Sequence, residues 1–392
     1  MASGYFLYPT LCGEHVAFVC DDDIWRLDLD GGPAYRITAG ESEHLTPSLS
    51  RDGRLVAFAA REDGPQEVYS MATQDGEPLR LTFQDSRAVV CGWTPEGQIV
   101  YSSSAERPFY SESWLYTIGP GGGLPCRIPW GPALSITFGP RGEVVLGRNT
   151  RDPSYWKRYR GGTMGELWVD PNPSGPDRFT VPGDFRRLST PEGNITAPCW
   201  VGDRIFFISD HEGIANVYSL DPDGEGLMRH TDHESFYVRH LRTDGRRLVY
   251  SCGTDLYWLD PEREQAKKIE VVLGSSRSQS KRRFYSVKGV GIQSYAISPD
   301  GSRLAVVARG KAFCFANWEG PVVQLGEPDG VRYRLLDWLS DQRQLAAFAC
   351  DESPVDYVHV RLRSTDGRCK VEAAACHVSD SGGSYEQDWI LR

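Results

Sequence analysis

Long hydrophobic runs are missing from this chain of 392 residues, and no apolar stretch is long enough to cross a bilayer as a helix. The first residues carry neither the basic segment nor the apolar core of a secretory signal. Positive charge is also in deficit, since 43 Lys and Arg face 53 Asp and Glu for a net charge of −10. This balance argues against general binding to nucleic acid or to anionic membranes. We therefore expect a cytoplasmic protein that binds neither.

The ten cysteines form no C-x-x-C pair, and six of them lie in or beside apolar stretches. Thiols in such positions are typical of buried, reduced cysteines rather than of disulfides or metal ligands. His230 and His233, with Asp232 and Glu234 beside them, raise the alternative of a metal site. A structural zinc needs four ligands, and the sequence offers no third and fourth near this pair. We interpret the pair as a turn cluster and expect no metal.

The sequence also lacks the short motifs that mark common catalytic centres. It contains no G-x-S-x-G elbow, no phosphate-binding G-x-x-x-x-G-K-[ST] loop and no H-E-x-x-H pair. No serine stands in a pattern that supplies a histidine base and an orienting carboxylate. We therefore expect no catalytic residue and no cofactor in this chain. The residues by themselves favour a scaffold that binds a partner or forms a channel.

What the chain has in abundance is a repeat of short apolar strands joined by Asp-Gly turns. In residues 239–251 one strand leads through Asp244 and Gly245 into a second, and a third strand with two aromatic residues follows at residues 255–260. Apolar residues alternate with period two and turn residues recur at nearly regular intervals, which favours strands over helices. A unit of four strands every ~40–50 residues is typical of one blade of a β-propeller.

Six such units follow one another in the first part of the chain. The sequence therefore predicts an all-β fold, in which residues 1–272 form a six-bladed β-propeller of four-stranded antiparallel blades. The units lie at residues 15–38, 46–82, 93–128, 136–188, 200–231 and 241–271.

A segment rich in Ser, Arg and Lys interrupts the pattern, and residues 273–285 are predicted to be a linker. A solvated basic loop is favoured there over a nucleic-acid patch, because no aromatic or glycine spacing accompanies the charges. The repeat restarts with one unit at residues 295–325 and a partial unit at residues 335–360. Two units cannot close a ring. We therefore expect residues 286–392 to form the first blades of a second, incomplete propeller with an irregular tail.

Several stretches of the chain are more specific than a generic propeller repeat. Residues 16–25, 147–168, 204–219 and 239–251 resemble the N-terminal propeller of the tricorn protease family. The Arg-Gly-Gly-Thr run in the second of these stretches is its most specific element. The resemblance extends over about residues 5–272.

The resemblance carries expectations about function. Tricorn proteases are large cytosolic serine peptidases that assemble as homo-hexamers and trim oligopeptides downstream of the proteasome or similar proteases. Oligopeptide substrates, further copies of the chain and aminopeptidases are therefore candidate partners. Their chains run from a six-bladed propeller through a seven-bladed propeller to a catalytic domain. The resemblance thus implies that this chain carries the first propeller and the opening blades of the second. The catalytic residues of the family lie beyond the part represented here, so no residue of this chain inherits their roles.

The resemblance also implies how the propeller would control access of the substrate and bind it. The ring of blades surrounds an axial passage that gates access, and the family uses two adjacent arginines in this propeller to hold the C-terminal carboxylate of the substrate. A guanidinium suits that role because it forms paired, charge-assisted hydrogen bonds. The matching loop here, residues 83–88, is shorter and holds only Arg87. Arg87 is therefore a candidate substrate-binding residue, with an ordinary solvated loop arginine as the alternative.

Basic and aromatic residues also gather in and around the stretch with the Arg-Gly-Gly-Thr run. The basic residues are candidates to face a peptide path or a neighbouring subunit. For the aromatic residues, packing between blades is the favoured interpretation, because aromatic side chains bury the most area. The basic residues are Arg148, Lys157, Arg158 and Arg160, and the aromatic residues are Trp156, Tyr159 and Trp168.

Three classes of function remain open at this point. The first is the N-terminal part of a tricorn-type serine peptidase, inactive alone and active in gating and assembly. The second is a stand-alone propeller that binds peptides or proteins without catalysis. The third is a propeller enzyme with its own axial site, which would need a cluster of histidines and carboxylates that the sequence does not display.

Overall fold

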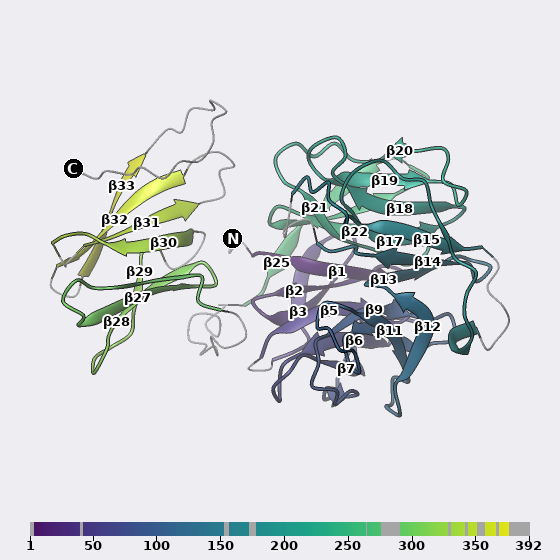
Figure 1. The fold of residues 1–392 in the computed structure, drawn as a ribbon, viewed down its shortest axis with the longest axis horizontal. Coiled ribbons are helices and arrows are strands. Elements are labelled where there is room, and N and C mark those ends of the chain that lie inside the picture. The colour runs from purple at the N-terminus through teal and green to yellow at the C-terminus, as the bar shows by residue number, and fades with distance from the viewer. Residues whose placement is uncertain are drawn as a thin grey trace. The chain divides into compact units, whose positions relative to one another are not determined.

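The computed structural model describes residues 4–39, 42–152, 157–171, 178–263, 265–275, 291–327, 331–341, 344–350, 357–365 and 368–375. The chain divides into two compact units, Met1–Arg282 and Arg283–Arg392. In the described part, every regular element is a β-strand except one short 3-10 helix, η1 (Arg178–Thr180) (Figure 1). No helix among the described residues is long and apolar enough to span a membrane. The predicted all-β fold is confirmed.

Six sheets build the first unit, and each contains four consecutive antiparallel strands. The first strands of successive sheets are neighbours, and the sixth returns to the first, so the sheets form the blades of a closed six-bladed propeller. Blade 1 contains β1 (Leu7–Cys12), β2 (His15–Cys20), β3 (Asp23–Asp28) and β4 (Gly32–Arg36), and blade 2 contains β5 (His44–Leu49), β6 (Leu55–Ala60), β7 (Glu67–Ala72) and β8 (Leu79–Arg80). Blade 3 contains β9 (Ala88–Trp93), β10 (Ile99–Ser103), β11 (Trp114–Ile118) and β12 (Cys126–Pro132), and blade 4 contains β13 (Ser135–Phe138), β14 (Val144–Arg148), β15 (Glu166–Asp170) and β16 (Arg186–Arg187). Blade 5 contains β17 (Ile195–Val201), β18 (Arg204–Ser209), β19 (Asn216–Leu220) and β20 (Met228–Arg229), and blade 6 contains β21 (Val238–Thr243), β22 (Leu248–Cys252), β23 (Asp255–Asp260) and β24 (Gln265–Ile269).

The period-two alternation of each strand supplies the propeller with its core. Successive side chains of a strand point to opposite faces of the sheet, so each blade packs against both of its neighbours. In β2, Ala17 and Val19 pack against blade 2, whereas Val16 and Phe18 pack against blade 6. A cluster of buried apolar side chains lies between every pair of neighbouring blades in this way.

The ring closes between blades 6 and 1 by packing and by one added strand. The chain leaves β24 and continues into β25 (Val271–Leu273), which pairs in parallel with β4 as a fifth strand of the first sheet. The amide of Gly32 donates to the carbonyl of Glu270 at 2.7 Å. Gly31 has a φ of 89°, and a Cβ there would lie 2.8 Å from the same carbonyl. This close approach requires glycine at that position.

A polar tether recurs in three blades and was not foreseen from the sequence. A residue with a side-chain oxygen begins the third strand of the blade, and a threonine follows fifteen positions later. The threonine hydroxyl donates a hydrogen bond to that oxygen and accepts one from the next backbone amide of the third strand. The hydroxyl, the side-chain oxygen and the amide are thus all hydrogen-bonded although they are buried. The pairs are Asp23 with Thr38, Glu67 with Thr82, and Asn216 with Thr231.

The innermost strands of five blades contain β-bulges. The register shifts in β1, β5, β9, β17 and β21, each time by one extra residue on the inner strand. Tyr8, Thr46, Ala197 and His240 lie at four of these shifts with φ values of 49°, 47°, 52° and 55°. Left-handed backbone is uncommon for such residues, and bulges with this geometry re-aim side chains and leave backbone groups free of the ladder.

The described residues of the second unit form two further four-stranded antiparallel sheets, which are too few to close a ring. Their shared core includes Val307 and Leu325 from the first sheet and Tyr333 and Leu345 from the second. Residues 276–290, which hold most of the expected linker, and residues 376–392 lie outside the described part. The strands are β26 (Ser294–Ile297), β27 (Arg303–Ala308), β28 (Lys311–Ala316) and β29 (Val323–Leu325), followed by β30 (Arg332–Trp338), β31 (Gln344–Cys350), β32 (Tyr357–Thr365) and β33 (Arg368–Ala375).

Candidate functional site

Two cavities lie along the axis of the propeller, and residues from all six blades line each of them. Cavity A, of about 560 Å³, is lined by the ends of the first strands of the blades and by the turns that follow them. Cavity B, of about 640 Å³, is lined by the beginnings of the same strands and includes all four left-handed bulge residues. The two cavities share Ile136, Pro198 and Arg242. The axis therefore has two hollow ends that meet at these three side chains.

The charge of cavity B is opposite to that of the whole chain. Four arginines line it, Arg87, Arg151, Arg239 and Arg242, together with a single carboxylate, Asp152, although the chain carries a net charge of −10. Positive charges around a concave site raise the local concentration of anions. Guanidinium groups in particular bind carboxylates through paired hydrogen bonds. Cavity B is therefore suited to an anionic group.

Asp152 is already engaged by its neighbours. Arg239 Nε lies 3.0 Å from Asp152 Oδ1, and Arg239 Nη2 lies 2.9 Å from Oδ2. His240 Nε2 lies 3.1 Å from the same Oδ2. Burial tends to raise the pKa of Asp152, but His240 and Arg239 outweigh burial and hold that pKa well below its usual range. Asp152 thus neutralises Arg239, while Arg87 and Arg151 form no ion pair with any described residue.

His240 is held in the network in its uncharged form. Its Nδ1 lies 2.9 Å from the Ser251 hydroxyl and 3.5 Å from the backbone amide of Tyr8. Burial lowers the pKa of His240, and the opposing effect of Asp152 does not restore it. A neutral imidazole leaves Asp152 and Arg239 as the charged pair at this side of cavity B.

We expect the thermal stability of the propeller to fall as the pH is lowered from about 7.5 to about 5.5, and to fall less in a His240→Gln variant. The pKa of His240 is lower in the folded chain than its usual value. The unfolded chain therefore binds more protons below about pH 6.5, and stability is lost as the pH falls through that range. Thermal denaturation followed by circular dichroism at the two pH values measures the effect. An identical pH dependence in both proteins would contradict it.

The structure places Arg87 at the wall of cavity B, on an exposed and well-anchored loop. The Glu67 carboxylate accepts the backbone amides of Gln84 and Asp85 at 2.7 and 2.9 Å. The Ser86 hydroxyl lies 3.0 Å from the hydroxyl of Ser104 in the next blade. These bonds hold the loop so that Arg87 is presented to the cavity.

The other basic candidates line neither axial cavity. Arg148 stacks on the Trp168 ring at 4.4 Å, and burial lowers the pKa of Arg148. Lys157 lies 5.1 Å from the ring of Tyr237. The carboxylate of Asp210 is buried and accepts two hydrogen bonds from this stretch. The backbone amide of Arg158 donates to it at 2.7 Å, and the guanidinium of Arg160 donates to it at 3.0 Å. Trp156 lies outside the described residues.

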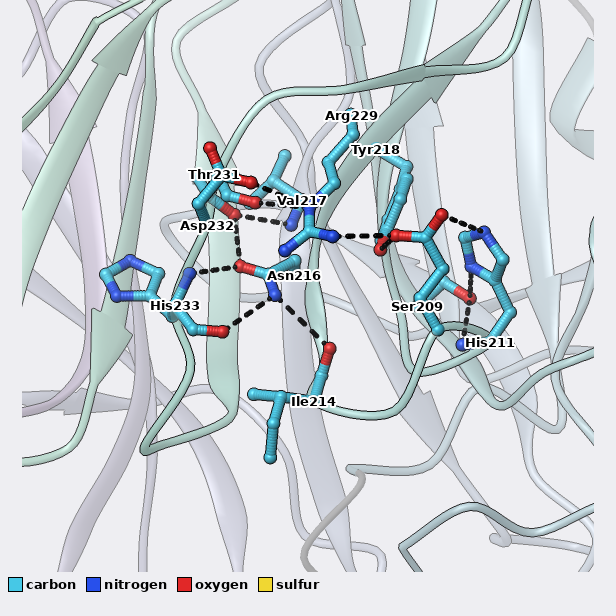
Figure 2. Close-up of polar contacts among 11 residues, drawn as sticks. Ser209, His211, Ile214, Asn216, Val217, Tyr218, Arg229, Thr231, Asp232 and His233 are labelled. Atoms are coloured by element: carbon cyan, nitrogen blue, oxygen red, sulfur yellow. Dashed lines mark hydrogen bonds and ion pairs between the residues drawn. The ribbon is translucent and has the colours of Figure 1, made fainter.

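Ser209 and His211 of blade 5 lie side by side (Figure 2), and Glu212 is the next residue in the chain. Ser209 Oγ is 3.0 Å from His211 Nδ1, and His211 Nε2 is 3.9 Å from Glu212 Oε1. Ser209 is fully buried, however, and its hydroxyl also accepts the backbone amide of His211 at 3.3 Å. Glu212 accepts hydrogen bonds from Tyr218 and Arg229, each at 2.8 Å. The cluster therefore orders a turn and offers no accessible nucleophile.

The two histidines considered from the sequence as metal ligands have separate partners. His230 Nε2 lies 2.7 Å from the Ser219 hydroxyl, whereas His233 Nε2 lies 3.0 Å from the hydroxyl of Tyr250. The backbone of His233 is bound on both sides by the Asn216 side chain (Figure 2). Across the described residues, no three His, Cys, Asp or Glu side chains are grouped to hold a metal ion.

The family of the chain follows from comparison with known proteins. Residues 3–265 match the model of the tricorn protease N-terminal beta propeller domain, which covers well over half of the chain. The chain belongs to the tricorn protease family. The arginine-lined axis described above is thus the axis of a tricorn-type propeller.

The tricorn relatives that this chain matches are much longer than it. It is 33% identical over 338 residues to a tricorn protease homolog of Saccharolobus solfataricus, a match that covers 86% of this chain and 30% of that protein. It is 36% identical over 348 residues to tricorn protease homolog 1 of Streptomyces coelicolor, covering 85% and 31%. The crystal structure of the tricorn protease matches with a TM-score of 0.63 and 25% identity, covering 94% of this chain and 39% of that one. The chain therefore spans about a third of the length of these relatives.

Nothing in the sequence indicated that Arg151, Arg239 and Arg242 line cavity B. Arg239 and Arg242 are three positions apart, so a regular strand would point them to opposite faces. The bulge at His240 inserts one residue between them and brings both to cavity B. Arg151 lies in a loop, and nothing in its local pattern distinguishes it from a solvated arginine.

Proposed function

We propose that this chain supplies the N-terminal propeller of a tricorn-type serine peptidase, and that cavity B binds the C-terminal carboxylate of an oligopeptide. The observation that supports this proposal is the pair of exposed, unpaired arginines, Arg87 and Arg151, at a cavity whose only carboxylate is taken by Arg239. The resemblance implies two adjacent arginines in one loop of the family's propeller, whereas the matching loop of this chain holds only Arg87. In this chain the second cation comes from a different blade, so Arg151 takes the place of the missing neighbour of Arg87.

The proposal assigns binding and gating to this chain and catalysis to a part of the peptidase beyond it. Peptide hydrolysis would require a C-terminal catalytic portion in the same assembly, which we propose to be a cytoplasmic homo-oligomer. A stand-alone binding propeller would use cavity B in the same way without that portion. Mixing the chain with a separately expressed C-terminal portion distinguishes the two, because only the peptidase proposal predicts hydrolysis of fluorogenic tri- and tetrapeptides.

The binding role can be tested with the chain alone. A fluorescein-labelled pentapeptide with a free C-terminus is expected to bind ~10-fold or more tightly than the same peptide with an amidated C-terminus, because one charge-assisted contact is worth ~1.5–3 kcal/mol. Arg87→Gln and Arg151→Gln should each weaken binding of the free-carboxylate peptide by about 10-fold. Fluorescence anisotropy at low salt measures both effects.

Arg246→Gln provides the matched control, since Arg246 lines cavity A and not cavity B. It should leave the affinity for the free-carboxylate peptide unchanged. Equal affinity for the free and amidated peptides would show that cavity B does not bind the C-terminal carboxylate, and would contradict the proposal.

A further inference from the structure

The Arg242 side chain crosses the axis of the propeller. Arg242 belongs to β21 of blade 6, and its guanidinium donates to the carbonyls of Val90 and Cys91 in β9 of blade 3. The Nη2 nitrogen lies 3.0 Å from the Val90 oxygen. Blades 3 and 6 are opposite each other in a ring of six. The side chain therefore spans the passage and does not lie along its wall.

The carbonyls that hold Arg242 are available because β9 is bulged. Val90 pairs with Tyr101 and Gly92 with Val100, so Cys91 is the extra residue of the inner strand. A bulge removes the extra residue from the regular ladder and turns its backbone groups away from it. Two neighbouring carbonyls then face the axis, and a guanidinium carries two donors at the spacing needed to bind both.

Arg242 also marks the boundary between the two cavities. It is one of three side chains that line both of them, with Ile136 of blade 4 and Pro198 of blade 5. Ile136 is buried and Pro198 has a fixed ring, so neither can move aside as freely as a long arginine. Arg242 forms no ion pair with any described carboxylate, and its guanidinium donates hydrogen bonds to the two carbonyls.

We propose that Arg242 closes the axial passage, so that a peptide end entering cavity B stops at the guanidinium and cannot thread through to cavity A. While Arg242 stays bound to the two carbonyls, cavity B is a blind pocket that accepts chain ends and returns them through the same mouth. The inference rests on the proposed function only in taking a peptide as the chain that enters. Its specific content is that the side chain of Arg242, and no other feature, prevents passage.

Mechanical trapping tests this directly. A Gly/Ser-rich, uncharged peptide of about 24 residues reaches ~80 Å when extended, whereas a first strand such as β1 has six residues and spans ~20 Å. A threaded peptide of this length protrudes from both mouths. With biotin at both ends, it is incubated at high concentration with the full chain and then capped with streptavidin. During gel filtration in high salt, only peptides that pass through the ring stay with the protein and elute with it.

The wild-type chain is expected to retain no more doubly capped peptide than singly capped peptide, and Arg242→Ala to retain at least about 10-fold more. Arg242→Met keeps most of the length of the side chain while losing both hydrogen bonds, and it should allow intermediate retention. Arg246→Ala is the control for loss of an arginine in cavity A. Thermal denaturation followed by circular dichroism verifies that each variant is folded. If Arg242→Ala does not fold, Arg242→Met tests the inference in its place.

Each result decides the inference. Trapping by the wild-type chain at the level of Arg242→Ala would show that the passage is already open. Absence of trapping in both folded Arg242 variants would show that another feature closes it. Because the trapped peptide is uncharged and capped, this assay does not depend on carboxylate binding, so failure of the proposed function appears only in the anisotropy experiment.

Discussion

Replacing Phe18 by alanine is expected to lower the free energy of unfolding of the propeller by ~4 kcal/mol, because a large buried side chain is removed and a cavity is left. Phe18 is fully buried in β2, and its ring lies 5.2 Å from that of Phe6. Both belong to the cluster that joins blade 1 to blade 6, with Val249 and Leu256 on the other side. The loss should lower Tm by roughly 10 °C, measured by calorimetry or circular dichroism.

Phe83→Ala is the matched control for Phe18→Ala. Phe83 is 74% exposed, and its ring lies 4.5 Å from the Arg80 guanidinium. Its replacement should cost about 1 kcal/mol or less. If both substitutions lowered Tm equally, the packing between blades 1 and 6 would not be what holds the ring closed.

Asp152→Ala is expected to lower the free energy of unfolding at neutral pH by ~3 kcal/mol, because it leaves the partly buried Arg239 guanidinium without its partner. Both side chains are about one quarter exposed, at 24% and 25%. The pKa of Asp152 is lowered in the folded chain. Its contribution to stability is therefore complete above the usual carboxyl pKa of about 4 and is lost as the pH falls below that value. Urea denaturation at about pH 7 and about pH 3.5 should show the difference from wild type shrinking in acid.

Two variants sharpen the Asp152 experiment. Asp28→Ala removes an exposed carboxylate that pairs with His15 at the surface, and it should change stability by less than about 0.5 kcal/mol. The double variant Asp152→Ala, Arg239→Ala removes both charges and should be more stable than Asp152→Ala alone. A destabilisation no larger than that of Asp28→Ala would show that the pair does not hold the loop at Asp152 to blade 6.

The all-β fold and the blades could be predicted from the sequence because they depend on short-range patterns. The alternation in residues such as 15–20 and 248–252 and the turns at Gly53 and Gly245 specify hairpins of neighbouring strands. Six such units in succession then leave a closed ring as the arrangement that buries both faces of each blade. The family resemblance made Arg87 a candidate substrate-binding residue. The structure places Arg87 at the wall of cavity B, and its role in binding stays a prediction.

The rest of the candidate site could not be predicted because it depends on where distant strands meet. Arg151 belongs to blade 4, Arg239 to blade 6 and Arg87 to the entry of blade 3, and no spacing along the chain relates them. A strand pattern with period two also hides the bulge that turns Arg239 and Arg242 to the same side. The basic candidates Arg148, Lys157, Arg158 and Arg160 stood out by composition, but they line neither axial cavity.

The sequence by itself determined the class of fold, the number of blades in the first ring and the family, since local alternation and turn residues encode hairpins one at a time. Only the tertiary structure decided which arginines surround the axis, which of them Asp152 neutralises, and that Arg242 reaches from blade 6 to blade 3. The physical reason is that bulges and ring closure place groups from different blades within hydrogen-bond distance, and these contacts have no counterpart in the order of residues along the chain.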